Sequence, residues 1–303
     1  MSAPVSARWA LALIFITPAL WSVNYLVGRL APGNIAPHML ALARWALAAA
    51  LLACFAWTEL REKRAVLLNK GWQYLVLGGL GMWICGAWVY IGARTTSATN
   101  ISLIYALSPV FIAVLSSLWL HDKLGRWQWL GVALAFTGLV HVVIKGNWNA
   151  LTQVRLVAGD LWILAATLAW TLYSFFLKRW PSSLSPISRL VMIAAGGVVV
   201  LIPFTVAEAW SGLPMTQTQW GWKAVALIAA AGIIPGAGAY LAYSTLQKAV
   251  GAARASLPLY LAPLYAAIIA YLVLGEPIFA YHVVGACVIL PGIYLASRVP
   301  SAQ

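Results

Sequence analysis

The chain contains the sequence SLIYALSP at residues 102–109 and a related sequence, SLPLYLAP, at residues 256–263. The serine, the leucine and the last proline match at an offset of 154 positions. The same offset pairs later residues of the two halves: Gly131 with Gly285, Gly138 with Gly292, and Asp122 with Glu276. Nearer the start of each half the offset is 149, which pairs Trp21 with Trp170 and Pro37 with Pro186. Apolar residues align by chance, but proline, glycine and acidic residues do not easily keep one offset. We therefore predict two related halves, residues 1–149 and 150–303.

The composition indicates a membrane protein. Hydrophobic residues make up 63% and charged residues only 8% of the 303 residues, whereas about 25% charged residues is usual in a soluble domain. The apolar runs are about 20 residues long, enough to cross a bilayer as helices whose backbone groups are bonded internally. We predict an all-α integral membrane protein with ten transmembrane helices, at about residues 8–28, 38–58, 72–92, 98–119, 127–145, 159–178, 187–208, 222–246, 253–273 and 279–297.

The basic residues predict how these helices are oriented. With both termini in the cytoplasm, thirteen of the 19 Lys and Arg residues lie in or beside cytoplasmic segments, five lie beside external ones, and Arg44 falls within a span. This bias follows the positive-inside rule, so we expect a multi-pass protein of the cytoplasmic (inner) membrane with both ends inside. Five spans per half, an odd number, invert the second half relative to the first. Inverted repeats are typical of transporters, which bind their substrate near the midplane between the repeats.

The two five-span halves, the Ser-Leu-x-x-x-x-x-Pro stretches and the acidic residue after each of them resemble the drug/metabolite transporter superfamily. Within it the chain is similar to the ten-span EamA-type branch and to the YddG-like aromatic amino-acid exporters. The resemblance implies export of amino acids or similar metabolites through a cavity between the inverted halves. One feature differs from the small multidrug relatives, which carry a glutamate in the first span: here the nearest polar or amphipathic groups are Trp21, Asn24 and Tyr25. Export of hydrophobic drugs or other xenobiotics is the alternative function.

Candidate substrate-binding residues are aromatic or polar side chains in the predicted spans. Ligand sites combine aromatic walls with a few polar groups, although Trp and Tyr also form belts at membrane interfaces. The residues chosen on this basis are Trp21, Asn24, Trp83, Tyr90, Asn100, Tyr105, Trp162, Trp170, Tyr240, Tyr243, Ser244, Ser256 and Tyr260. In the third span, Gly79, Trp83, Gly86 and Tyr90 would share one face of an α-helix.

Two further features of the spans have alternative interpretations. Pro109, Pro258 and Pro263 remove backbone donors from the fourth and ninth spans, which predicts either hinges or kinked packing helices. Arg44 lies about two turns inside the second span, where a charge is costly. Its side chain either extends to the outer interface or contacts the substrate.

Other partners and activities are disfavoured by the residue pattern. The basic residues are scattered between spans, which disfavours nucleic acid and favours membrane lipids as partners. Cys54, Cys85 and Cys287 lie inside apolar segments, so we expect no disulfide, no metal site and no cofactor. No HExxH motif or phosphate-binding loop is present, so we expect no enzyme activity; a membrane-embedded enzyme is the remote alternative. The substrate is a small molecule of unspecified identity, and the oligomeric state stays open, with a monomer among the alternatives.

Overall fold

The computed structural model describes residues 7–92, 95–96, 98–120, 124–211, 217–274 and 277–297. Helices dominate this part of the chain, and no β-strand occurs within it. The first five passes through the bundle are α1 (Ala7–Leu30), α2 (Pro37–Glu62), α4–η1–α5 (Gly71–Gly78, Gly79–Trp88, Val89–Gly92), α6–α7 (Ala98–Tyr105, Ser108–Trp119) and α8 (Arg126–Val143). The second five are α9 (Ala158–Arg179), α10 (Pro186–Trp210), α11–η4–α12 (Trp222–Ala231, Gly232–Ala239, Tyr240–Val250), α13–η5–α14 (Ala252–Ser256, Leu257–Leu261, Ala262–Leu274) and α15 (Ala280–Ser297). Two short helices, α3 (Arg64–Asn69) and η2 (Trp148–Gln153), lie in connections.

The predicted all-helical membrane fold with ten passes is confirmed. Eight passes are long and apolar enough to cross a membrane, and residues 280–296 form a shorter apolar helix. Large apolar side chains on the outside of the bundle, such as Phe55 at 82% and Trp210 at 85% exposure, suit contact with lipid. The predicted ends differ by a few residues: α2 continues to Glu62 instead of 58, and α8 ends at Val143 instead of 145.

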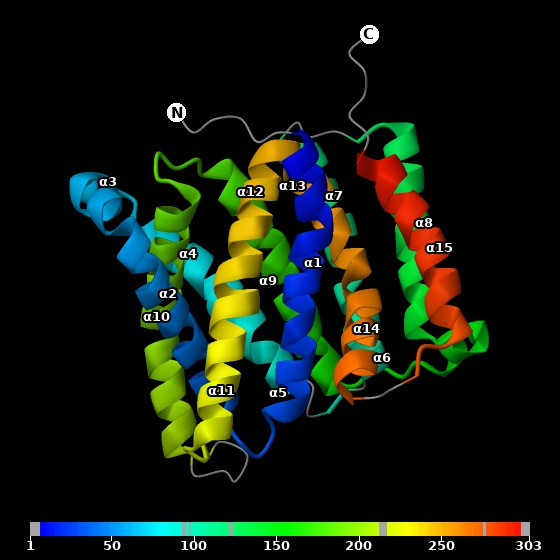
Figure 1. Ribbon diagram of the computed structural model, residues 1–303, viewed down its shortest axis with the longest axis horizontal. Coiled ribbons are helices and arrows are strands. Elements are labelled where there is room, and N and C mark those ends of the chain that lie inside the picture. The colour runs from blue at the N-terminus through cyan, green and yellow to red at the C-terminus, as the bar shows by residue number, and fades with distance from the viewer. Residues whose placement is uncertain are drawn as a thin grey trace.

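The passes alternate in direction, so that α1 begins and α15 ends at the same side of the bundle (Figure 1). We call this the terminal side, and the other the opposite side. Helix α1 runs from the terminal side to the opposite side, whereas its counterpart in the second half, α9, runs the other way (Figure 1). Equivalent helices of the two halves are therefore antiparallel, as an inverted repeat requires.

The helix contacts also interchange when each helix is replaced by its counterpart in the other half. Helix α1 packs against η4, α12 and α14 of the second half, and α9 packs against η1, α5, α6 and α7 of the first. Helices α2 and α10 are counterparts and pack against each other, as do α8 and α15. The core is thus built by contacts between halves more than within one half.

Glycines allow the close crossing of α8 and α15. A Cβ atom on Gly131 would lie 2.5 Å from the carbonyl oxygen of Gly292, and one on Gly292 would lie 2.6 Å from the backbone nitrogen of Ala135. Both distances are shorter than real contacts allow, so these backbones touch directly. A second close crossing, of Gly78 in α4 against Gly197 in α10, was not predicted.

Four passes are interrupted, and the interruptions fall in counterpart helices. The third and eighth passes contain the π-helical segments η1 and η4. The fourth pass is divided at residues 106–107, just before Pro109, and the ninth changes to the 3-10 segment η5, which contains Pro258 and is followed by Pro263 in the first turn of α14. The three prolines therefore lie at breaks between helical segments; whether they act as hinges stays a prediction.

Candidate functional site

Six aromatic rings meet between the two halves. This central ring cluster consists of Trp21 (α1), Trp45 (α2), Trp170 and Tyr173 (α9), and Tyr240 and Tyr243 (α12). The indoles of Trp21 and Trp170, which the 149-residue offset pairs, meet edge to face at 5.3 Å between centroids. The other contacts within the cluster have centroid distances of 4.8–5.8 Å. These are the usual separations of favourable aromatic pairs.

The central ring cluster is closed in this structure. Trp45 and Tyr243 have no exposed surface, and Tyr173 has 1%. Trp170 and Tyr240 are also buried, and Trp21 is half-buried. Because the rings are in contact, a solute cannot pass between the halves at this level until the rings separate.

The hydroxyls of Tyr240 and Tyr243 are held by specific acceptors. The Tyr243 hydroxyl donates to Oγ of Ser174 over 2.8 Å, and the amide nitrogen of Gln247 donates to the Ser174 carbonyl over 2.8 Å. The Tyr240 hydroxyl donates to the carbonyl of Gly81 over 3.1 Å. Gly81 lies in η1, where a Cβ atom would be 2.8 Å from the ring of Tyr173. The absence of a side chain at Gly81 thus allows Tyr173 and Tyr240 to pack on η1.

A polar group adjoins the cluster on α1, α2 and α5. Arg44 donates from Nη1 to Oδ1 of Asn24 over 3.1 Å, and the Tyr90 hydroxyl approaches the same oxygen at 3.5 Å. The Arg44 guanidinium carbon lies 5.2 Å from the centre of the Trp45 ring. Arg44 is only 5% exposed. Its side chain is therefore held inside the bundle by Asn24 and Trp45, and whether it contacts the substrate stays a prediction.

The structure brings together part of the predicted set. Trp21, Trp170, Tyr240 and Tyr243 belong to the central ring cluster, and Asn24 and Tyr90 form the polar group with Arg44. Ser244 lies on the next position of α12, half-buried, and its hydroxyl donates to the Leu241 carbonyl over 3.1 Å. Whether these residues bind substrate stays a prediction.

Two predicted tryptophans lie elsewhere. Trp83 stacks on Phe204 of α10 at 3.9 Å, and Trp162 is 40% exposed with its ring edge on Trp88 at 4.9 Å. The expectation that Gly79, Trp83, Gly86 and Tyr90 share one face is wrong. Residues 79 and 83 face α10, Gly86 faces Arg44, and Tyr90 faces α1. The reason is the π-helical segment η1, whose wider turn breaks the 3.6-residue spacing on which the prediction relied.

Asn100 belongs to a different polar group, at the opposite side of the bundle. Its amide nitrogen donates to Oδ2 of Asp160 over 3.0 Å and to the carbonyl of Arg155 over 3.0 Å. The Thr96 hydroxyl also donates to Asp160, which in turn accepts from the backbone nitrogen of Val157 at the start of α9. This group ties the start of α6 to the start of α9.

The remaining predicted residues lie on the interrupted fourth and ninth passes. Tyr105, half-buried, is the last residue of α6. Ser256 is buried and donates to the Ala253 carbonyl over 2.7 Å. Tyr260 is fully buried in η5, with its ring 6.4 Å from that of Phe136 in α8. The Tyr260 ring thus packs the ninth pass against α8, and the Ser256 hydroxyl bonds within the ninth pass.

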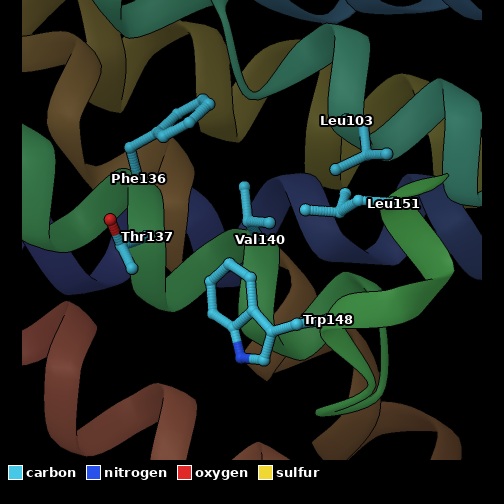
Figure 2. A pocket seen from close by; sticks show the side chains of 6 residues that line it. All are labelled: Leu103, Phe136, Thr137, Val140, Trp148 and Leu151. Atoms are coloured by element: carbon cyan, nitrogen blue, oxygen red, sulfur yellow. The ribbon is translucent and has the colours of Figure 1, made fainter.

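Two cavities lie away from the central ring cluster. The first, of about 290 Å³, is mostly apolar and is lined by side chains from α6, α8 and η2 (Figure 2), namely Leu103, Phe136, Thr137, Val140, Trp148 and Leu151. The second, of about 380 Å³, lies between the ends of α2 and α10 and includes Met39, Thr205 and Glu208. Among the residues that the structure describes, no three His, Cys, Asp or Glu side chains are grouped as metal ligands would be.

Sequence reasoning missed Trp45, Tyr173, Ser174 and Gly81. One signal was available, because Tyr173 is the residue that the 149-residue offset pairs with Asn24. Extending the repeat comparison from Trp21 and Trp170 by three residues would have found it. Gly81 had no such signal, since its role depends on the path of η1.

Comparison with known proteins agrees with the helix arrangement. The family model described as EamA-like transporter family matches twice, at residues 8–144 and at residues 157–298. An uncharacterized transporter of Bacillus subtilis (strain 168), YyaM, is 30% identical over 279 residues, which cover 91% of this chain and 88% of YyaM. An uncharacterized transporter of Archaeoglobus fulgidus is 24% identical, covering 94% of this chain and 96% of its own length. A crystal structure with 16% sequence identity superposes with a TM-score of 0.76 over 95% of this chain and 97% of its own. The chain is thus a multi-pass membrane protein and a transporter that belongs to the EamA-like transporter family.

Proposed function

We propose that this transporter exports amino acids, aromatic or neutral, or similar small metabolites by alternating access between its inverted halves. The observation that carries the proposal is the central ring cluster, to which both halves contribute and which blocks the space between them. Flat and apolar side chains bind well among aromatic rings, and a few fixed polar groups orient them. A block made of rings from two antiparallel repeats can release towards either side as the halves move relative to each other.

The proposed orientation places the terminal side in the cytoplasm of the inner membrane. Basic residues of the described chain support it: Arg61, Lys63, Arg64, Lys70, Arg126, Lys178, Arg179 and Lys248 lie at the terminal side. The opposite side carries fewer, among them Lys145, Arg155 and Lys223. A fluorescent protein fused after Gln303 should fluoresce and alkaline phosphatase fused there should be inactive. The reverse result would contradict this orientation.

The function is tested by flux into proteoliposomes. Purified protein should transport labelled phenylalanine, tryptophan or leucine faster than protein-free vesicles do. Trp21 touches three other rings of the cluster, so Trp21→Ala removes a ring against which the side chain of the substrate would pack. Loss of one aromatic contact to the substrate, about 0.5–1.5 kcal/mol, should lower the flux up to about tenfold. Trp210→Ala removes a ring that is 85% exposed and should leave the flux unchanged. Absence of wild-type flux over a broad panel of amino acids and nucleosides would reject the proposal.

Flux should follow the substrate gradient. Asp160, which is buried, and Glu208, which is half-buried, lie at the opposite side of the bundle, and Glu59 lies at the terminal side. None of these three adjoins the central ring cluster, where a proton-coupling carboxylate would act. An imposed proton gradient should therefore change the initial rate little, and a strong acceleration would contradict this expectation.

A hydrophobic drug exporter is the second candidate, favoured by the apolar character of the ring cluster itself. The two functions differ in phenotype. Expression of a drug exporter raises resistance to aromatic xenobiotics, whereas an amino-acid exporter raises resistance to toxic amino-acid analogues.

A further inference from the structure

Arg44 is a buried cation with incomplete hydrogen bonding. Its Nη1 donates to an amide oxygen of Asn24, and its buried Nε has no partner among the residues that the structure describes. A charge inside a membrane protein is costly unless another charge or a set of hydrogen bonds compensates it. The neutral amide of Asn24 supplies one acceptor, so the five donors of the guanidinium are only partly used.

A second unused donor lies beside the guanidinium. The indole nitrogen Nε1 of Trp45 is buried and has no partner in the described part of the chain. A Cβ atom on Gly86 would lie 3.2 Å from Nη2 of Arg44 and 3.6 Å from Nε1 of Trp45. The guanidinium of Arg44, through Nη2, and the indole nitrogen of Trp45 therefore both border Gly86, a residue without a side chain. The site offers positive charge and N–H groups, and Oδ1 of Asn24 already accepts from Nη1 of Arg44.

The carboxylates of the described chain are not placed to neutralise Arg44. Glu208 accepts from the backbone nitrogens of His38 and Met39 at the start of α2. Glu59 accepts from the backbone nitrogen of Ser185 before α10, and Asp160 is bound by Thr96 and Asn100. Glu62 is exposed at the end of α2. None of the four carboxylates that the structure describes therefore neutralises Arg44, which makes the anionic group of a bound molecule a suitable partner.

We propose that Arg44, with Trp45 and Asn24, binds the carboxylate of the transported molecule, while the central ring cluster receives its side chain. Trp45 belongs to both sites: its ring packs on Tyr240 at 4.8 Å and its nitrogen faces the guanidinium side. The anion-binding donors and the apolar rings are therefore adjacent, which is the arrangement of a carboxylate and a side chain in one amino acid. Arginine with a second N–H donor is well suited to a carboxylate.

The proposal rests on the proposed function and narrows it. The substrate class becomes small carboxylates, and amines without a carboxylate are excluded because Arg44 repels them in a buried environment. The competing explanation is structural, in which Arg44 only links α2 to Asn24 of α1. In that case ligand charge would not matter, and substitution of Arg44 would weaken the binding of carboxylates and amides equally.

The test compares matched ligand pairs. Flux and thermal stabilisation are measured for phenylalanine against phenylalaninamide, leucine against leucinamide, and 3-phenylpropionate against phenethylamine. The wild-type protein should prefer each carboxylate by about tenfold or more, as expected for a charge-assisted hydrogen bond. Arg44→Met should remove that preference, and Arg44→Lys should keep part of it. Arg155→Met removes the same charge from an exposed position and should leave the preference intact.

The outcomes separate the two proposals. If the wild-type protein transports none of these compounds and nothing in the broader panel, the proposed function fails. If it transports amides or amines as well as it transports carboxylates, the function stands and the carboxylate site is rejected. An unchanged preference in Arg44→Met also rejects it. Should Arg44→Met not fold, the wild-type ligand pairs and Arg44→Lys decide alone.

Discussion

Aromatic residues of the same type make different contacts in the bundle, although nothing in the sequence distinguishes them. Trp21 and Trp170 meet across the two halves, whereas Trp83 and Trp162 pack near Trp88, outside the ring cluster. Tyr240 and Tyr243 are three positions apart on α12, yet one hydroxyl reaches η1 and the other reaches α9. Each hydroxyl therefore links α12 to a different neighbour.

The Tyr243–Ser174 bond should make a measurable contribution to stability. Tyr243→Phe removes the hydroxyl that donates to Oγ of the buried Ser174. Loss of this hydrogen bond should lower the free energy of unfolding by about 1 kcal/mol. The measurement is thermal or denaturant unfolding in detergent. Tyr271→Phe is the control, because that ring is 52% exposed. Equal stability of both variants would show that the bond contributes nothing.

The sequence predicted those site residues that occupy equivalent positions in the two halves. It missed residues whose place in the site depends on the path of the backbone. Trp21 and Trp170 are found from their offset alone. Arg44 was recognised as unusual, but the direction of its side chain depends on Asn24 and Gly86, which only the packed helices bring near. The role of Gly81 could not be predicted, because it depends on the path of the π-helical segment η1, which brings this residue against Tyr173 and Tyr240.

At the scale of helices, the two crossings that contain glycine set how closely the halves approach. Gly292→Ala places a methyl group 2.6 Å from the backbone of Ala135, so α8 and α15 must separate. Such overpacking should cost about 1–3 kcal/mol of stability. Gly71→Ala is the matched control, since nothing lies within 4 Å of its Cβ position. Comparable melting temperatures for the two variants would contradict the direct backbone contact seen here.

The starts of α2 and α10 each bond a carboxylate from the last turn of the other helix. Glu208 accepts from the backbone nitrogens of His38 and Met39, and Glu59, 149 residues earlier, accepts from the backbone nitrogen of Ser185 and the hydroxyl of Ser188. Carboxylates stabilise helix starts by bonding unpaired N–H groups and opposing the helix dipole. Glu59 and Glu208 are separated by 149 residues, the same offset that relates the two halves. Their contacts were not predicted, because they depend on which helix ends are neighbours in the fold.

Removing a cap should weaken the protein more than removing an ordinary surface charge. Glu208→Ala should lower the stability in detergent by about 1–2 kcal/mol, since two backbone donors lose their acceptor. Glu62→Ala, at an exposed position at the end of α2, should change it little. A Glu208→Ala protein as stable as Glu62→Ala would show that water replaces the carboxylate at no cost.

For the whole molecule, the closed ring cluster implies that transport requires the halves to move. Ser174 is fully buried beside the cluster, so a cysteine placed there, with Cys54, Cys85 and Cys287 replaced by alanine, should react slowly with a charged thiol reagent at rest. During substrate flux the reaction should become faster. Ser183→Cys, in an exposed connection, should react equally under both conditions. Equal rates at residue 174 would mean that the rings never part.

The reciprocal caps of α2 and α10 have a consequence for how the protein is made. When the first half leaves the ribosome, α2 has already been synthesised but Glu208, which completes its first turn, has not. Until the second half is inserted, the backbone nitrogens of His38 and Met39 at the start of α2 therefore lack the acceptor that Glu208 provides in the complete protein. Residues 1–149 and 150–303 produced as separate polypeptides should accumulate together and be degraded when either is produced alone.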